Sequence, residues 1–203
     1  MSLARVVVTA QSNGALEMLQ RRVGGILKGL AHVSKIYPDQ YQIGKVNPDL
    51  VVAYAKGLRV EEIKSWYPGK PFIAVELVIH STGIRSIKQI AEDKIIGIVA
   101  KHRRCANYFL EEITKSISLN NRLVTGCFDD VNKSISADVY LISGEMEEDT
   151  KNRALRVIPS HKLVMVSRTI SPYSAAELIN VTYEINREKK ERGFVGYRRA
   201  VEA

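Results

Sequence analysis

The chain has 203 residues, of which 45% are apolar and 26% charged, with a formal net charge of +8 at pH 7. This make-up excludes a low-complexity or disordered polypeptide, and no apolar run approaches the roughly 20 residues that span a bilayer. The two cysteines, Cys105 and Cys127, lack Cys-x-x-Cys or metal-ligand spacing. We therefore expect a soluble, cytoplasmic protein with no metal and no cofactor, and with no membrane partner. The positive charge suggests an anionic ligand, a nucleic acid or an acidic partner surface.

The first half of the chain predicts an alternation of strands and helices. After the first strand, Leu16, Leu19, Val23, Ile26 and Leu27 fall on one face of a helix. The strand segments are rich in β-branched residues and read as buried on both faces, which is typical of parallel sheets. The predicted strands cover residues 5–10, 32–37, 50–54 and 72–79.

The second half repeats this order. A helical stripe, including Ala106, Leu110 and Ile113, follows its first strand, and the predicted strands cover residues 95–100, 123–128, 139–143 and 163–168. A last helix starts near Ser171 and Pro172, which is favoured at the first helical position. Its charged second part is expected to project from the fold as a linker.

The two halves have matching residues at a constant spacing. Leu110 follows Leu19 by 91 residues, Pro159 follows Pro68 by 91, and Asp138 follows Asp49 by 89. A repeat of this length predicts two similar domains rather than a solenoid. We expect an α/β protein with two closely joined three-layer α/β/α lobes and mainly parallel sheets. The predicted boundaries are 1–88 and 89–172 for the lobes and 173–203 for the C-terminal helix and tail, with a small-molecule site in a cleft between the lobes.

Several catalytic motifs are absent from the sequence. No Gly-x-Gly-x-x-Gly follows the first strand, and the chain has neither a P-loop nor a Gly-x-Ser-x-Gly elbow. These absences argue against a dinucleotide-binding domain, a P-loop ATPase and an α/β-hydrolase. The acidic pair Glu111 and Glu112 is interpreted as part of a solvated helix face.

A candidate ligand site can be derived from the strand ends. Ligands of α/β sheets bind beyond the carboxyl ends of the strands, where helix N-termini present free N–H groups. The run from Lys101 to Arg104 precedes a helix, so its charge and the helix dipole both favour a carboxylate or phosphate. Arg168 ends an apolar strand and should meet either a ligand or a carboxylate of the protein itself. The predicted ligand-binding residues are Gln11, Ser12, Asn13, Ser81, Thr82, Lys101, His102, Arg103, Arg104, Ser143, Arg168 and Thr169.

The segment from Ser136 to Glu145, with the later Val157-Ile-Pro and Val166-Ser-Arg-Thr-Ile-Ser-Pro, resembles the N-terminal sensory region of sigma-N-dependent, NtrC-like bacterial regulators. Their input domain is similar to the receptor domain of the propionate-catabolism activator. The resemblance implies a regulatory domain that binds a polar or anionic metabolite and signals through the C-terminal helix. Its partners would be downstream ATPase and DNA-binding modules, in the same or another protein. It is compatible with a homodimer and argues against direct DNA binding by this chain.

Two other functions stay open. A two-lobed α/β enzyme of lyase or synthase type could use polar groups of the cleft without a classical cofactor motif. A nucleic-acid-binding protein could use the basic surface, and would then be retained on DNA in a strongly salt-dependent way.

Overall fold

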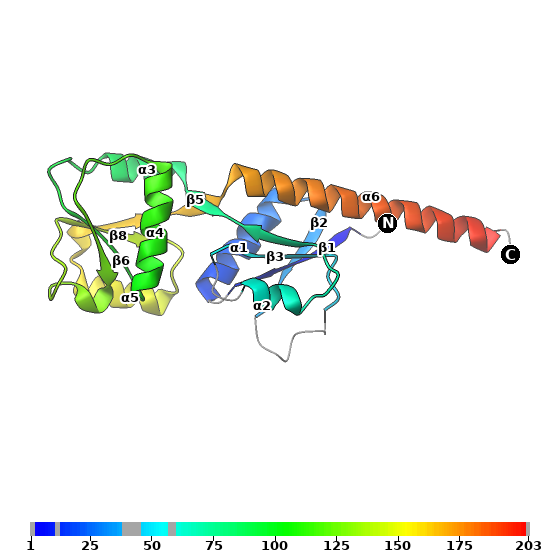
Figure 1. Ribbon diagram of the computed structural model, residues 1–203, viewed down its shortest axis with the longest axis horizontal. Coiled ribbons are helices and arrows are strands. Elements are labelled where there is room, and N and C mark those ends of the chain that lie inside the picture. The colour runs from blue at the N-terminus through cyan, green and yellow to red at the C-terminus, as the bar shows by residue number, and fades with distance from the viewer. Residues whose placement is uncertain (1–2, 11–12, 38–45, 57–59, 202–203) are drawn as a thin grey trace. The chain divides into compact units, whose positions relative to one another are not determined.

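The computed structural model describes residues 3–10, 13–37, 46–56 and 60–201, with side chains described up to residue 192. The chain divides into two compact units: Met1–Glu76 together with Ile170–Ala203, and Leu77–Thr169. Each unit is a parallel sheet covered by helices (Figure 1), which confirms the predicted α/β class.

The first unit is built on a four-stranded parallel sheet in the order β2-β1-β3-β4. Alternate residues of β3 face opposite layers: Val51 and Ala53 pack with Ile63 and Tyr67 on the side of α2. The other face is covered by α1 and α6, which contact each other and β1. The described elements are β1 (Ala4–Thr9), α1 (Asn13–Ile26), β2 (Ala31–Lys35), β3 (Leu50–Tyr54), α2 (Val60–Ser65), β4 (Phe72–Val75) and α6 (Pro172–Val201).

The second unit has the same strand order, β7-β6-β8-β9, again all parallel. Ile96 and Ile98 of β6 pack with Phe109 and Ile113 of α4 on one face. Val99 packs on the other face, where α5 lies. The described elements are β5 (Leu77–Ile79), α3 (Ser81–Lys88), β6 (Ile96–Ala100), α4 (Arg103–Ser116), β7 (Leu123–Cys127), η1 (Phe128–Asp130), β8 (Val139–Ser143), α5 (Glu148–Val157), η2 (Ser160–Lys162), β9 (Leu163–Val166) and β10 (Arg168–Ile170).

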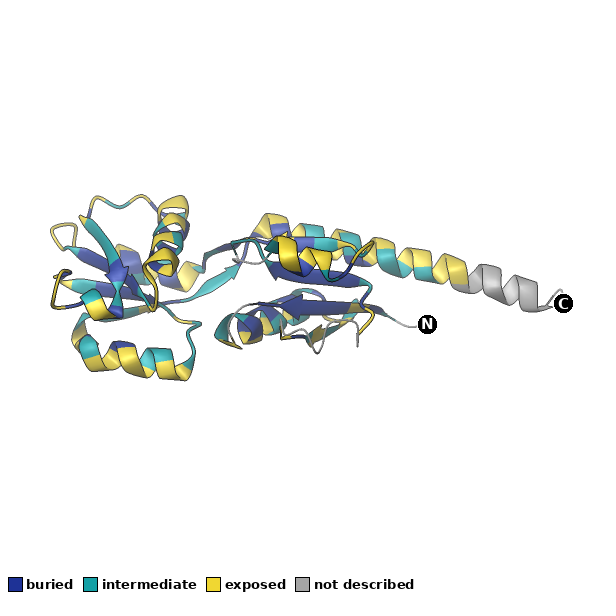
Figure 2. Ribbon diagram, turned by 60° about the horizontal axis from the view of Figure 1, so that its bottom comes forward, coloured by how far each residue is buried: buried dark blue, intermediate teal, exposed yellow. Residues whose placement is uncertain are grey.

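Burial follows the two-sided covering of both sheets. The central strands are buried along most of their length, whereas the helices bury one stripe and expose the other (Figure 2). Leu16, Leu19 and Val23 of α1 are completely buried, and each such side chain contributes about 1.5–3 kcal/mol of hydrophobic stabilisation. The amphipathic stripes therefore hold the helices against the sheets.

The structure confirms the repeat and corrects its register in the first strand and helix. Val6 pairs with Leu50 as Ile96 pairs with Val139, and α4 starts 90 residues after α1. The predicted spacing of 91 was wrong by one residue there. It holds for β4 and β9, for β5 and β10, and for the starts of α3 and α6.

Two segments predicted as single strands are each divided in two. Residues 72–79 form β4 and β5, separated at Glu76, and the segment 163–168 forms β9 and the start of β10, separated at Ser167. The second pieces pair in a sheet of their own. The hydrogen bonds from His80 N to Ser167 O (2.9 Å) and from Ser171 N to Glu76 O (2.8 Å) show that β5 and β10 run antiparallel.

The helices that follow these short strands do not pack on the sheet formed by the preceding half of the sequence. α3 follows the first repeat but packs on β9 of the second unit, whereas α6 follows the second repeat and packs on β4 of the first. The boundary predicted at residue 88 therefore differs from the division of the structure, which falls after Glu76 and again after Thr169.

Candidate functional site

The basic run predicted as an anion site lies where β6 ends and α4 begins. His102 is the N-cap of α4, with extended backbone angles, and Lys101, His102, Arg103 and Arg104 are all exposed. The first turn of α4 contains no acidic residue, so the helix dipole adds to the positive charge of these side chains. This end of α4 therefore has the electrostatics that attract a carboxylate or phosphate.

Two of these cations are also held by the protein itself. A guanidinium N–H of Arg103 donates to Asp130 Oδ2 at 3.2 Å, and Arg104 Nε donates to the Tyr108 hydroxyl at 2.8 Å. The backbone N–H of Cys127 donates to the same oxygen of Asp130 at 2.8 Å. This backbone hydrogen bond, followed by the one from Arg103, lowers the pKa of Asp130. Arg103 is thus oriented by an ionised carboxylate that η1 holds in place.

A buried ion cluster lies near the carboxyl ends of β8 and β9. Arg168 Nη1 lies 3.3 Å from Glu112 Oε2, and Arg168 Nε lies 3.3 Å from Glu145 Oε2. The backbone N–H of Arg168 also donates to Glu145 Oε1 at 2.8 Å. The side chains are 15%, 2% and 5% exposed for Arg168, Glu112 and Glu145. The sequence predicted either a ligand or a carboxylate of the protein as the partner of Arg168, and the structure shows carboxylates.

Neighbouring groups complete the cluster. Ser143 Oγ donates to Glu145 Oε2 at 3.0 Å, so two predicted site residues, Ser143 and Arg168, meet through Glu145. The Arg168 guanidinium also lies 5.9 Å from the centre of the Phe109 ring, within cation–π range. Ionised groups that are this well buried and hydrogen-bonded hold their elements in one arrangement, here β10, α4 and the turn after β8.

Glu112 shows where the sequence interpretation was wrong. It was assigned to a solvated face, yet the residue is only 3% exposed and faces Arg168. It lies between the buried residues Phe109 and Ile113 on the inward stripe of α4. That position in the sequence could have indicated that Glu112 faces inward. A carboxylate buried in this way requires a cation beside it.

In the first unit, the strand end corresponding to this edge contains Thr9 and Asn13. Asn13 is exposed at the start of α1, whereas Gln11 and Ser12 lie outside the described residues. Thr9 is 2% exposed, and its hydroxyl forms no hydrogen bond with any residue that the structure describes. An unpaired buried hydroxyl costs about 1–3 kcal/mol, and the buried hydroxyl of Thr182 in α6 likewise has no partner among the described residues.

The remaining predicted residues lie on the second unit. Ser81 and Thr82 were assigned to the first lobe, but they form the exposed first turn of α3, which belongs to the second unit. His80 caps this turn: its Nδ1 accepts from Thr82 N at 3.3 Å. Thr169 lies next to Arg168 in β10 and is half-buried. The second unit therefore carries every described candidate except Asn13.

Comparison of the chain with protein-family models, with curated proteins and with solved structures finds no match. Among the described residues there is no group of three or more His, Cys, Asp or Glu side chains placed to hold a metal ion. No helix in the described ranges combines the length and apolarity required to cross a bilayer.

Proposed function

We propose that the chain is a regulatory sensor domain, which binds a polar or anionic metabolite at the carboxyl ends of its parallel strands and passes the binding event to α6. The observation that carries this proposal is the buried cluster of Arg168 with Glu112 and Glu145. It ties β10, which is followed directly by α6, to α4, the helix with the basic N-terminus.

The ligand class follows from the charges at the start of α4. Lys101, His102 and Arg104 are exposed next to free helix N–H groups, a combination that favours carboxylates and phosphates. Thr9, with its unpaired buried hydroxyl, supports a second polar contact at the strand ends of the first unit. The predicted position of the ligand in a cleft between the lobes stays a prediction.

The route from ligand to output is a chain of physical contacts. α4 presents the basic residues at its first turn and Glu112 two and a half turns later, where Glu112 holds Arg168. Arg168 belongs to β10, which ends at Ile170, and α6 begins at Pro172. An anion that displaces or rotates α4 would therefore change the free energy of the Arg168 cluster, and with it the start of α6.

α6 is the proposed output element. Its first part is fixed to the first unit, since Leu178 and Thr182 are completely buried, and the helix then continues to Val201. As the resemblance to sigma-N-dependent regulators implies, such a helix would lead to an ATPase module and a DNA-binding module in the cytoplasm. These downstream modules are part of the proposal.

A thermal-shift screen of the full chain tests ligand binding, with C2–C6 mono-, di- and tricarboxylates, sugar phosphates and inorganic phosphate. We expect at least one anion to stabilise the protein, and we expect Lys101→Ala/His102→Ala to weaken its binding by about tenfold or more. The matched control is Lys133→Ala/Arg156→Ala, which removes two exposed basic residues elsewhere in the same unit.

The screen has three outcomes that contradict the proposal. One is that no anion shifts the unfolding temperature, and another is that the control pair weakens binding as much as the site pair. The third is chemical conversion of the stabilising compound, seen by NMR of that compound incubated with the protein, which would indicate the two-lobed enzyme instead of a sensor.

A further inference from the structure

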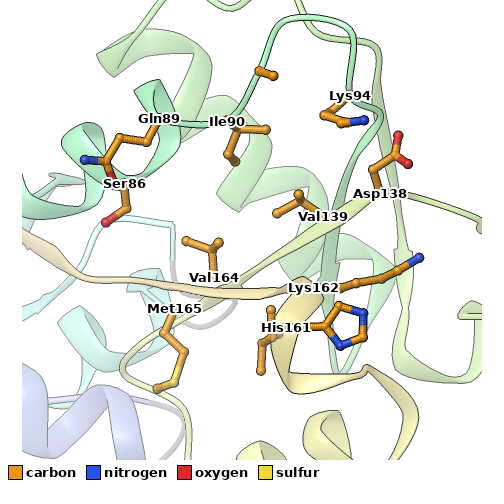
Figure 3. Close-up of a pocket in the computed structure, with 12 residues that line it drawn as sticks. Ser86, Gln89, Ile90, Lys94, Asp138, Val139, His161, Lys162, Val164 and Met165 are labelled. Carbon is orange, nitrogen blue, oxygen red and sulfur yellow. The ribbon is translucent and has the colours of Figure 1, made fainter.

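The second unit has an open groove that is separate from the buried ion cluster. It has a volume of about 790 Å³ and lies between the end of α3, the turn that follows it, the start of β8 and the edge strand β9. Apolar side chains, including Ile90, Val139 and Val164, line it together with polar and charged ones (Figure 3). None of the predicted ligand-binding residues lines this groove.

The repeat shows what covers the corresponding surface in the first unit. α3 ends at Lys88, whose equivalent in α6, 91 residues later, is Ile179. α6 continues past that point and packs on the first unit, where Thr182 is completely buried. In the second unit the chain turns away after α3, because it must reach the start of β6 at Ile96.

Burial of equivalent residues supports this comparison. Leu50 and Ile73 are 0% and 3% exposed in the first unit. Their equivalents in the second unit, Val139 and Val164, are only partly buried and line the groove. The second sheet thus keeps two apolar positions open to solvent that the first sheet covers.

The same polar arrangement marks one end of both surfaces. Asp49 accepts a hydrogen bond from Arg5 N at 2.7 Å, and Asp138 accepts the equivalent bond from Ile95 N at 2.9 Å. In the first unit α6 supplies Lys189, whose ammonium lies 2.6 Å from Asp49 Oδ2. In the described part of the chain no cation forms an ion pair with Asp138.

We infer that this groove is a docking site for an amphipathic helix of a partner polypeptide. The helix would place an apolar stripe over Val139 and Val164 and a lysine or arginine next to Asp138, as α6 does on the first unit. Acidic residues on its flanks would suit Lys94, His161 and Lys162, which also line the groove. This interaction goes beyond the proposed metabolite sensing and does not depend on it.

The probe is a synthetic peptide with the sequence of residues 174–192, because this segment carries Leu178, Ile185 and Lys189 in their native spacing. Its binding to the full chain is measured by fluorescence anisotropy, and its position by methyl NMR of Ile90, Val139 and Val164. We expect saturable binding below about 1 mM and shifts at these three residues. A peptide with Leu178→Asp/Ile185→Asp should bind at least about tenfold more weakly.

Charge reversal makes the assignment specific. Asp138→Lys should weaken the peptide by about tenfold, and a peptide with Lys189→Glu should restore most of the loss. The matched control is Asp149→Lys, which reverses an exposed carboxylate of α5 in the same unit, outside the groove, and should change binding by less than about twofold.

Three results would overturn the inference: no peptide binding at about 1 mM, shifts confined to residues outside the groove, or equal effects of Asp138→Lys and Asp149→Lys. Octanoate serves as a small apolar anion in the same NMR experiment. If octanoate shifts Ile90, Val139 and Val164 while the peptide does not, the groove takes a small molecule and the helix assignment is wrong.

Discussion

The two units share one strand order but differ in the helix that covers their last strand. On the first unit this helix is α6, with 30 residues, and on the second it is α3, with eight. The longer helix buries Thr182 and pairs Lys189 with Asp49, whereas the shorter one leaves a groove beside Asp138. The same architecture therefore anchors a long helix in one unit and leaves an apolar surface open in the other.

The ion cluster is the second difference between the units. Arg168 in β10 corresponds to Leu77 in β5, 91 residues earlier, so the charged cluster has no counterpart at that position. Arg168→Leu leaves Glu112 and Glu145 buried without their cation, and we expect it to reduce the free energy of unfolding by about 3–5 kcal/mol. Urea denaturation measures this loss.

The control for Arg168→Leu removes the charge imbalance as well. Arg168→Leu/Glu112→Gln/Glu145→Gln should recover a large part of the lost stability, because no ionised group is then left unpaired. If the single and triple variants were equally unstable, the cluster would matter through packing rather than through charge.

A smaller loss of stability is expected from a substitution at Gly97. Gly97 pairs with Tyr140 across β6 and β8, where the first unit has the pair of Val7 and Val51. A Cβ at Gly97 would lie 2.7 Å from Tyr140 Cδ1. Gly97→Val should therefore cost about 3 kcal/mol by overpacking. In Gly97→Val/Tyr140→Val, which reproduces the pair of the first unit, the two effects should be non-additive by at least about 1 kcal/mol. Strict additivity in urea denaturation would show that the ring does not limit the space at Gly97.

The equivalent residues Asp49 and Asp138 provide a matched test, with a smaller expected change in the free energy of unfolding. Burial opposes ionisation of Asp49, but the hydrogen bonds from Lys189 and from Arg5 N outweigh it and lower its pKa. Asp49→Asn should cost about 1–2 kcal/mol at pH 7, whereas Asp138→Asn, which keeps its backbone hydrogen bond, should cost less than about 0.5 kcal/mol.

The pH dependence gives the sign of the Asp49 effect. A lowered pKa in the folded state stabilises the protein above the unfolded value of 3.8 and loses this contribution as the pH falls through the folded pKa. The difference between wild type and Asp49→Asn should therefore be constant from neutral pH down to about pH 5, shrink once the pH falls below 3.8 and disappear below the folded pKa. A difference that grows on acidification would contradict the ion pair with Lys189.

The smallest expected effect is a gain in stability. Thr9 corresponds to Val99 of the second unit, 90 residues later, where the side chain packs in an apolar cluster. Thr9→Val removes a buried hydroxyl that forms no hydrogen bond with the described residues, so we expect a gain of about 1 kcal/mol in urea denaturation. If Thr9 contacts the metabolite, the same variant loses the thermal shift. A loss of stability would instead mean that the hydroxyl is satisfied.

Strand positions were the most predictable part of the fold. The predicted strands 50–54 and 139–143 match β3 and β8 because short apolar runs bounded by polar residues define both ends. The division at Glu76 was missed because the apolar pattern continues on both sides of it, and the division at Ser167 because no glycine or proline marks it. No local pattern indicates which sheet a helix will cover, so the packing of α3 and α6 on opposite repeats could not be predicted.

The candidate site was predicted in part. The sequence placed Lys101–Arg104 at the start of a helix and required a partner for Arg168, and the structure agrees with both. It could not identify Glu112 and Glu145 as those partners, because ion pairs between distant segments depend on tertiary packing. The groove could not be predicted from the sequence either, since its walls come from α3, β8 and β9 and no motif marks them.

Hydrogen exchange of the full chain tests the central claim most directly, with and without the anion that gives the largest thermal shift. Transmission through Arg168 predicts slower exchange at residues 101–106 together with a change at residues 171–182, where α6 begins. Slower exchange at the start of α4 with no change in α6 would contradict the proposed transmission through Arg168.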